Sequence, residues 1–247
     1  MSGKPEKKPR ITVITVVYNG EKHLEETIRS VINQTYVNVE YIIIDGGSTD
    51  GTLDIIKRYE EKIDYWVSEP DKGIYDAMNK GLACATGDYV AFMNADDWYE
   101  PDALEAVADA IVKTEADFIT ANIRIIDEET KESVIRYSTF DEYGKNIHHQ
   151  TCFINLSLHK QFPFNTQYQL AADRDLIVRV IKSGVATHFI DKVVANFREG
   201  GKGSNMLKYQ IELFDSNAKN VGILFALKRF ALNMTGRTLL NLLKIKR

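Results

Sequence analysis

The chain has 247 residues, 44% of them hydrophobic, and its 31 basic and 35 acidic residues give a formal net charge of −4. This balance argues against a general nucleic-acid binder, because such domains carry a surplus of basic residues. The length suits one large α/β domain, and no stretch reaches the roughly 18 consecutive apolar residues of a membrane span. Two cysteines and a polar start, MSGKPEKKPR, predict a protein of the reduced cytoplasmic compartment.

The first part of the chain alternates between two hydrophobic periods. Runs rich in β-branched residues, such as ITVITVV and EYIIID, predict buried strands, and each is followed by a segment with helical spacing. We predict strands over 11–19, 40–45, 63–69 and 88–94, with helices over 21–34, 53–62 and 73–86 between them. This order predicts four parallel strands by residue 98, joined by right-handed connections.

The rest of the chain is less regular. A helix is expected to begin near Pro101, and a second one covers 171–184. We predict further strands over 117–127, 132–140 and 150–158, and one from 187 that leads into a glycine-rich loop.

The C-terminal segment has a charge pattern of its own. After Asp215 there is no acidic residue, whereas seven lysines and arginines follow among apolar residues at helical spacings. This pattern predicts one or two helices that lie on an anionic membrane surface. The alternative is a helix packed on the domain with a solvated basic face.

Acidic residues follow two of the predicted parallel strands. Asp45 ends the second strand, and Asp96 and Asp97 follow the fourth in the segment MNADDW. Ligands of open α/β sheets bind outside the carboxyl ends of the strands, so we expect these carboxylates to lie near one another. Adjacent carboxylates offer the hard oxygen ligands that Mg²⁺ or Mn²⁺ prefers. The alternative is that they are turn residues or helix caps.

Two other segments have two interpretations each. GGSTDGT, at 46–52, could cradle a phosphate at the start of a helix, or it could be a tight turn in which glycine takes a positive φ. Asp173 and Asp175 begin a helix, where they could cap it or supply a general base. Taken alone, these residues favour the turn and the cap. His148 and His149 precede a predicted strand and should point to opposite faces, so they do not readily share a metal.

Several segments together resemble the inverting family 2 glycosyltransferases with a GT-A fold. They are residues 11–52, 68–81, 85–104 and 173–184, and their order makes the resemblance more specific than any single motif. The resemblance implies a GT-A catalytic domain over 10–204, with a mainly parallel α/β sheet flanked by helices. A flexible N-terminal tail over 1–9 and a basic amphipathic helical tail over 205–247 would flank this domain.

The resemblance also implies roles for residues in the donor site. Asp45 matches the first acid of the family's Asp-Asp-Gly-Ser segment, which holds the nucleoside, and Gly46 stands in place of the second acid. Asp96 and Asp97 match the end of the family's DxD region. One carboxylate there meets ribose or metal and the other meets the metal, whereas Asn94 replaces the first acid of the region.

The remaining site residues follow in the same way. Asp173 matches the catalytic base of the family's Glu-Asp pair, in which Ala172 replaces the glutamate. The positions that line the nucleotide pocket are matched by Thr15, Tyr18 and Asn19. Further candidates near the diphosphate or the acceptor are Lys72, His149 and Arg198.

The function implied is that of a Mn²⁺- or Mg²⁺-dependent inverting glycosyltransferase of bacterial type. It would move a sugar from a nucleotide sugar, with a UDP-sugar expected, to a glycan or polyprenyl-linked acceptor at the inner face of the cytoplasmic membrane. A homodimer is left open. One alternative is a non-catalytic nucleotide-sugar-binding or scaffolding relative, to which Gly46, Asn94 and Ala172 point. The other is a sugar-phosphate nucleotidyltransferase, whose glycine-rich loop with Arg and Lys is missing from 11–24.

Overall fold

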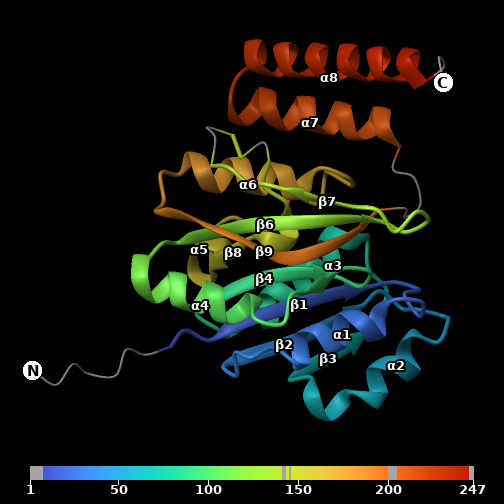
Figure 1. Ribbon diagram of the computed structural model, residues 1–247, viewed down its shortest axis with the longest axis vertical. Coiled ribbons are helices and arrows are strands. Elements are labelled where there is room, and N and C mark those ends of the chain that lie inside the picture. The colour runs from blue at the N-terminus through green and yellow to red at the C-terminus, as the bar shows by residue number, and fades with distance from the viewer. Residues whose placement is uncertain (1–7, 141–142, 145, 200–204, 245–247) are drawn as a thin grey trace, which may run out of the picture.

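The computed structural model describes residues 8–140, 143–144, 146–199 and 205–244, with side chains up to Met234. Within these residues the chain forms one nine-stranded sheet with helices on both faces (Figure 1). The strands are β1 (Ile11–Val17), β2 (Val39–Asp45), β3 (Tyr65–Ser68), β4 (Tyr89–Asn94), β5 (Trp98–Tyr99), β6 (Phe118–Asp127), β7 (Ser133–Arg136), β8 (Phe153–Asn155) and β9 (Thr187–Glu199). The helices are α1 (Leu24–Ile32), α2 (Thr52–Arg58), α3 (Ile74–Cys84), α4 (Ala103–Thr114), α5 (Leu156–Gln161), α6 (Ala172–Lys182), α7 (Met206–Asn220) and α8 (Ile223–Lys244), with 3₁₀ turns η1 (Glu60–Lys62) and η2 (His149–Thr151).

The prediction of four parallel strands is confirmed. β1 pairs in parallel with β2 on one side and β4 on the other, and β3 pairs in parallel with β2. In this register Val17 lies beside Asp45, and Val16 lies beside Asn94. The carboxyl ends of the three central strands therefore meet at one edge, where the strand order reverses around β1.

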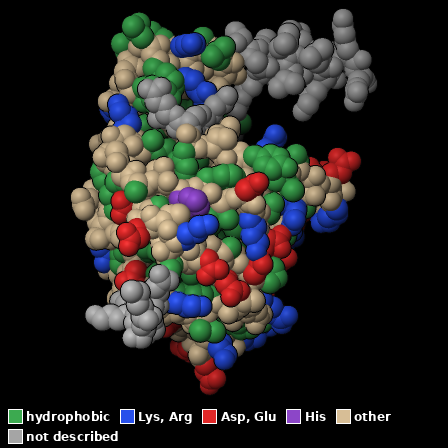
Figure 2. Space-filling view, turned by 60° about the vertical axis from the view of Figure 1, so that its left-hand side comes forward, with side chains coloured by type: hydrophobic (Ala, Val, Ile, Leu, Met, Phe, Trp, Pro, Cys, Tyr) green, Lys and Arg blue, Asp and Glu red, His purple; other side chains and the backbone are tan. Residues whose placement is uncertain are grey.

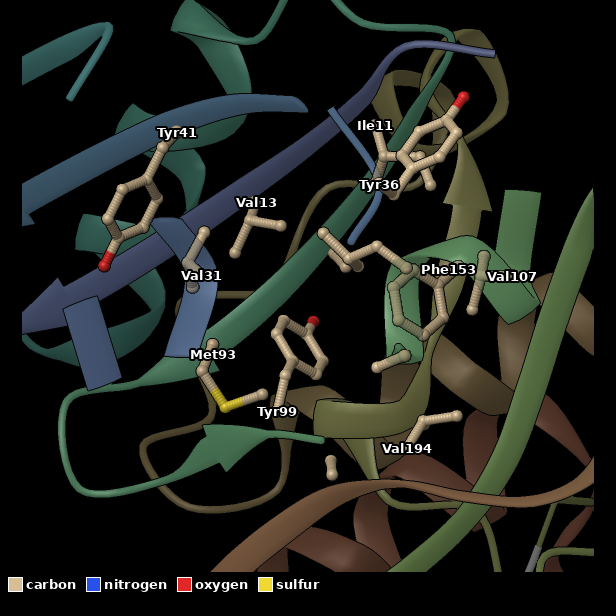
Figure 3. Close-up of a cluster of buried hydrophobic side chains, with 14 of the residues drawn as sticks. Ile11, Val13, Val31, Tyr36, Tyr41, Met93, Tyr99, Val107, Phe153 and Val194 are labelled. Carbon is tan, nitrogen blue, oxygen red and sulfur yellow. The ribbon is translucent and has the colours of Figure 1, made fainter. Parts of the chain in front are cut away.

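The sheet is covered on both faces, so β1 is buried along its whole length. One face packs on α1, α2 and α4, and the other packs on α3, α5 and α6. Figure 3 shows the first of these clusters, where Tyr41, Met93, Tyr99 and Phe153 point inward from β2, β4, β5 and β8. This three-layer packing holds the carboxyl edge of the sheet rigid.

The second half of the sheet departs from the predicted pattern. β8 is antiparallel to β4 and β6, and β9 runs parallel to β6. The strand predicted over 150–158 is wrong in its extent, because it divides into the end of η2, the short β8 and α5. Asn155 causes the last break, since its side chain accepts the backbone N–H of Leu158 and caps α5. β5 has two residues, too few for any pattern.

The C-terminal segment forms the predicted helices, and they stack on the domain. α7 lies over α6, and α8 lies over α7 (Figure 1). Phe214 and Phe230 hold α7 to α8, with ring centroids 5.8 Å apart. Side chains of α7 also form hydrogen bonds to α6. The helices after residue 204 therefore pack directly on the domain that precedes it. Most of the predicted flexible tail over 1–9 and the glycine-rich loop over 200–204 lie outside the described residues.

Candidate active site

A cleft of about 570 Å³ opens at the carboxyl edge of the parallel strands. Two smaller pockets of about 320 Å³ and 300 Å³ adjoin it through shared residues around Ile74, at the start of α3. The expected residues Tyr18, Asn19, Asn94, Asp96 and Arg198 all line the main cleft. The structure therefore brings together donor-site candidates from β1, β4 and β9.

Asp45 holds a tight turn together instead of projecting into the cleft. Its Oδ2 accepts the backbone N–H groups of Gly47 and Ser48 at 3.0 and 2.9 Å, and it also accepts the hydroxyl of Ser68 at 2.6 Å. Gly47 has a φ of +83°, which glycine adopts without strain. The turn interpretation of the GGSTDGT segment is thus the one observed, and a contact between Asp45 and a nucleoside stays a prediction.

Asn19 ties this turn to the end of β1. Its side-chain oxygen accepts the backbone N–H of Thr49 at 2.8 Å, and its own backbone N–H donates to the Ser48 hydroxyl at 2.7 Å. Tyr18, the preceding residue, is 65% exposed at the mouth of the cleft. The end of β1 therefore offers an aromatic ring beside a firmly held turn.

Gly46 lies directly beside the side chain of Asp71. A Cβ at this position would clash with the carboxylate of Asp71, which lies after β3. Asp71 lines the pocket of about 320 Å³ together with Tyr18 and Ile74. The acid missing at position 46 is thus replaced in space by Asp71, a residue that sequence reasoning did not single out. Asp71 follows the parallel strand β3 closely, and this position at the carboxyl edge could have identified it as a site candidate.

Thr15, which was expected in the nucleotide pocket, does not line the cleft. Thr15 is fully buried, and its hydroxyl is 3.1 Å from the Tyr41 hydroxyl within the α1 and α2 layer. Successive side chains of a strand point to opposite faces, so Thr15 shares the inner face of Val13 and Val17. Its side chain supports the sheet below the cleft.

The two adjacent acids, Asp96 and Asp97, have different environments. Asp96 is partly exposed and lines the cleft, whereas Asp97 is completely buried. Asp97 accepts the backbone N–H of Arg198 at 3.1 Å and the side-chain amide of Gln150 at 2.8 Å. Burial, followed by the neighbouring charge of Asp96, raises the pKa of Asp97 to about 7. The expected role of Asp97 as a direct metal ligand is therefore not supported by its position.

The protein oxygens in the cleft could bind a divalent cation that takes most of its other ligands from a bound phosphate compound. The side-chain oxygen of Asn94 is buried and has no hydrogen-bond partner among the residues that the structure describes, and Asn94 lines the cleft with Asp96. These are hard oxygen donors of the kind that Mg²⁺ and Mn²⁺ bind. Among the described residues, no three His, Cys, Asp or Glu side chains come together as a metal site. A cation here would need further oxygens from phosphate and water.

Arg198 places a fixed positive charge beside these oxygens. Its Nη2 donates to Glu26 at 2.5 Å, and its Nε donates to the backbone oxygen of Asp96 at 3.3 Å. The guanidinium also lies 4.7 Å from the centre of the Trp98 ring, within the range of a cation–π contact. These contacts hold the side chain at the edge of the cleft, where an anion could meet it.

Asp173 lies in the first turn of α6, with its side chain 21% exposed. Its Oδ1 accepts the hydroxyl of Tyr75 at 3.1 Å, and its Oδ2 lies 3.5 Å from Nδ1 of His149. Burial alone would raise the pKa of Asp173, but His149 and Arg174 outweigh it, so this pKa lies below the usual range. Asp173 is thus an ionised carboxylate that is already oriented, and α6 receives no cap from it.

Asp175 has a structural role by contrast. It is buried and accepts hydrogen bonds from Arg179, Ser216 and Asn220 at 2.7 to 2.8 Å. The two acids at the start of α6 are therefore clearly distinguished by their partners.

The turn η2 connects the two acidic centres. His149 contacts Asp173, and the adjacent Gln150 donates to Asp97. The strand predicted from residue 150 begins only at Phe153, because His149–Thr151 form the turn η2, from which His149 and Gln150 reach neighbouring sites. Lys72 lies farther along the edge and lines the pocket of about 300 Å³ with Tyr75. His149 is thus on the side of Asp173, and Arg198 is on the side of Asp96.

Known sequences resemble this chain over most of its length. The model of the family described as glycosyl transferase family 2 matches residues 12–179. The PGL/p-HBAD biosynthesis glycosyltransferase of Mycobacterium bovis (strain BCG / Pasteur 1173P2) is 31% identical over 211 residues, which are 81% of this chain and 80% of that relative. Glycosyltransferase GlyA of Streptococcus pneumoniae serotype 4 is 37% identical over 122 residues. That match covers 48% of this chain and 17% of GlyA.

Solved structures share the fold. The mannosyltransferase PcManGT from Pyrobaculum calidifontis, solved with GDP-Man and Mn²⁺, matches 94% of this chain and 72% of its own, with a TM-score of 0.68 and 21% identity. TarS 1–349 of S. aureus, solved with UDP, matches 85% of this chain, with a TM-score of 0.66 and 19% identity. This chain spans 64% of that TarS chain. At these identities the likeness concerns the arrangement of the sheet and helices.

Proposed function

This chain belongs to glycosyl transferase family 2, and from that premise we propose that it is an inverting, metal-dependent enzyme that uses a UDP-sugar. Its acceptor would be a hydroxyl of a glycan or a polyprenyl-linked glycolipid. The fold is the GT-A-like fold of its structural neighbours. The observation that carries the proposal is the connection, through η2, between Asp97, which lies behind the donor cleft, and an ionised carboxylate at Asp173.

The nucleotide would lie along the main cleft. Tyr18 offers an exposed ring on which a base can stack, and Asp71 beside it could accept an N–H of the base. Asp96 and Asn94 face the part of the cleft where ribose and diphosphate would follow. A UDP-bound structural neighbour supports a uridine donor, whereas the GDP-Man neighbour makes GDP-mannose the donor to test against it.

Asp96 and the side-chain oxygen of Asn94 would hold Mn²⁺ or Mg²⁺ together with diphosphate oxygens. When bound, the cation would neutralise charge that develops on the leaving diphosphate. Arg198 adds a positive charge at the same end of the cleft. Asp97 lies below these residues and orients the segment by its bonds to Arg198 and Gln150.

Asp173 would take the proton of the acceptor hydroxyl. The hydroxyl oxygen then attacks the anomeric carbon from the face opposite the diphosphate, the bond to the diphosphate breaks, and the configuration inverts. Tyr75 and His149 hold the carboxylate in place during this step. The low pKa of Asp173 keeps it ionised, as a proton acceptor must be.

The alternative of a non-catalytic relative is tested by turnover. Purified protein is incubated with UDP-glucose, UDP-N-acetylglucosamine or GDP-mannose, with and without Mn²⁺, and release of the nucleoside diphosphate is measured. We expect Mn²⁺-dependent release from a UDP-sugar, and NMR of the sugar product should show an inverted anomeric centre. No release from any of the three would favour the binding-only alternative. Family membership removes the nucleotidyltransferase alternative.

His149→Ala is expected to shift the acid limb of the pH–rate profile to higher pH. His149 is the main group that lowers the pKa of Asp173, so its removal raises that pKa, and the base becomes protonated at a less acid pH. Donor hydrolysis measured from pH 4 to 9 checks this expectation. His148→Ala is the control, because burial lowers the pKa of His148 to about 4 and leaves the side chain neutral through most of this range. An unmoved acid limb in His149→Ala would contradict the pairing.

The outer surface of α8 supports a peripheral position on the inner face of the cytoplasmic membrane. Leu224 and Leu227 are 80% and 52% exposed, and the exposed Lys228 follows them. Figure 2 shows hydrophobic and basic side chains together at this end of the molecule. Apolar residues among cations, without acids, fit an anionic lipid surface. Among the described residues, no helix is both long enough and apolar enough to span a bilayer.

Leu224→Glu combined with Leu227→Glu is therefore expected to weaken cosedimentation with phosphatidylglycerol vesicles by at least about tenfold. Each leucine withdrawn from lipid loses roughly 1.5 kcal/mol or more of burial free energy, and the new charges repel the vesicle. Val37→Glu, at a still more exposed apolar residue in the α1–β2 loop, is the control. Equal binding of the double variant and the wild type would show that α8 does not contact lipid.

A further inference from the structure

The backbone that leads into α6 is bound by a residue from another helix. The N-cap residue of α6, Ala171, has no side chain that could accept a hydrogen bond. Glu212 of α7 instead binds the chain just before the helix, since its Oε2 accepts the backbone N–H groups of Gln169, Leu170 and Ala171 at 3.0, 2.8 and 3.1 Å. These are the N–H groups that lead into the helix, and helix starts need such partners. One carboxylate therefore orders the whole entry to α6.

The environment of Glu212 shows that this contact is specific. The residue is 8% exposed, and a buried carboxylate is stable only when hydrogen bonds replace water. The N-terminus of α6 adds a favourable dipole for the negative charge. A serine at position 171 would accept an N–H group inside the helix, whereas Glu212 fixes the N-cap residue and the two residues before it. The contact thus holds a loop as well as a helix end.

That loop forms a wall of a pocket beside the proposed base. Residues 166 and 168–170 line the pocket of about 300 Å³, and residues 72–76 form its opposite side. Tyr75 of the opposite side donates to Asp173, which comes two residues after Ala171. α7 holds the loop at further points, because Asp215 accepts the hydroxyl of Tyr168 at 2.7 Å and Lys208 donates to the side chain of Gln169.

We propose that Glu212 is a positioning residue for sugar transfer and that the pocket it shapes receives the acceptor. The inference rests on the proposed function, in which Asp173 must lie within hydrogen-bond reach of the acceptor hydroxyl. Displacement of a catalytic group by about 1 Å can cost 10²-fold in rate. Glu212 acts through the loop and α6, and it touches neither donor nor acceptor.

Glu212→Ala tests this role through the kinetics of UDP-sugar hydrolysis, in which water replaces the unidentified acceptor. We expect kcat to fall by about 10- to 100-fold, while the KM for the donor changes less than about twofold, because residues 169–171 do not line the donor cleft. Glu212→Gln keeps an oxygen at the same position and should recover most of the rate. All variants are assayed well below their melting temperatures.

Ser216→Ala is the matched control. It removes another bond between α7 and α6, the one from Ser216 to Asp175 at 2.8 Å, and leaves residues 169–171 untouched. Its kcat should stay close to that of the wild type. A wild-type kcat in Glu212→Ala, or an equal loss in Ser216→Ala at a similar melting temperature, would overturn the proposal.

Amide hydrogen exchange over 166–176 gives a readout that needs no turnover. Exchange there should be faster in Glu212→Ala than in Ser216→Ala, and unchanged exchange would overturn the positioning role. If the wild type releases no UDP, the proposed function fails, whatever the exchange shows. If Asp173→Asn hydrolyses the donor normally, the base assignment fails, and Glu212 cannot act by positioning it.

Discussion

Asp173→Asn is expected to lower sugar transfer by about 10²- to 10⁴-fold while the protein stays folded. Asparagine keeps the shape of the side chain and can still accept the hydroxyl of Tyr75, but it cannot take a proton from the acceptor. Binding of UDP with Mn²⁺ should survive, because Asp173 is on α6 and the donor cleft is formed by β1, β4 and β9. Transfer, or donor hydrolysis if no acceptor is known, measures the loss.

The stability of this variant follows from the lowered pKa of Asp173. A carboxylate whose pKa is lower in the folded state than in the unfolded state stabilises the fold above its unfolded pKa, near 4. That contribution is lost as the pH falls through the lower folded value. Asp173→Asn should therefore melt slightly below the wild type at pH 7, and the difference should shrink in acid.

Asp175→Asn is the control, and the structure predicts the opposite signature for it. Asp175 bonds Arg179, Ser216 and Asn220 away from the cleft. Its substitution should lower the melting temperature and largely preserve the rate per folded molecule. A stable Asp173→Asn protein with near-normal transfer would remove Asp173 as the base, and a large rate loss at Asp175 would move the base there.

Asp96→Ala is expected to abolish the Mn²⁺-dependent part of stabilisation by UDP. A ligand present at about 100 times its Kd stabilises a fold by about 2.7 kcal/mol, which is a measurable shift in melting temperature. Asp96 is the carboxylate that lines the cleft, and its removal leaves the side-chain oxygen of Asn94 as the nearest protein ligand. Thermal melts with UDP, with and without Mn²⁺, check the result.

Asp97→Asn should keep the Mn²⁺-dependent shift, because Asp97 is buried behind the cleft. It has a separate pH signature. The pKa of Asp97 is raised by burial to about 7, so its ionisation costs stability as the pH rises from about 4 through about 7. Asparagine does not ionise, so this variant should gain stability over the wild type towards alkaline pH. If Asp97→Asn loses the Mn²⁺ effect and Asp96→Ala keeps it, the two roles are reversed.

Local patterns determined the first half of the fold. Strands that are buried on both faces need continuous apolar runs, and the amphipathic helices between them need a 3.6-residue period, so both are legible from the order of residues. The same reasoning places Asp45, Asn94 and Asp96 at one edge, because parallel strands all end on the same side. The family and the expectation of a cleft at this edge follow from those residues.

Tertiary structure alone decided which of these residues face the cleft. Asp96 and Asp97 are adjacent aspartates, but their environments differ. Gln150 and the backbone of β9 donate hydrogen bonds to Asp97, which is buried behind the cleft. Thr15 matches a family position, yet its hydroxyl bonds to Tyr41 below the sheet. Asp71 takes the space that Gly46 leaves open.

Long-range contacts were the least accessible to sequence reasoning. A division at residue 204 follows from composition, but Glu212 lies beyond it and orders the entry to α6. Hydrophobic periodicity indicates that α7 is a helix. It does not indicate which distant N–H groups will donate to Glu212, the buried carboxylate of that helix. Local sequence patterns thus predicted the four parallel strands, the edge at which they end and the family, whereas side-chain packing between distant segments set the charge states and contacts at the site.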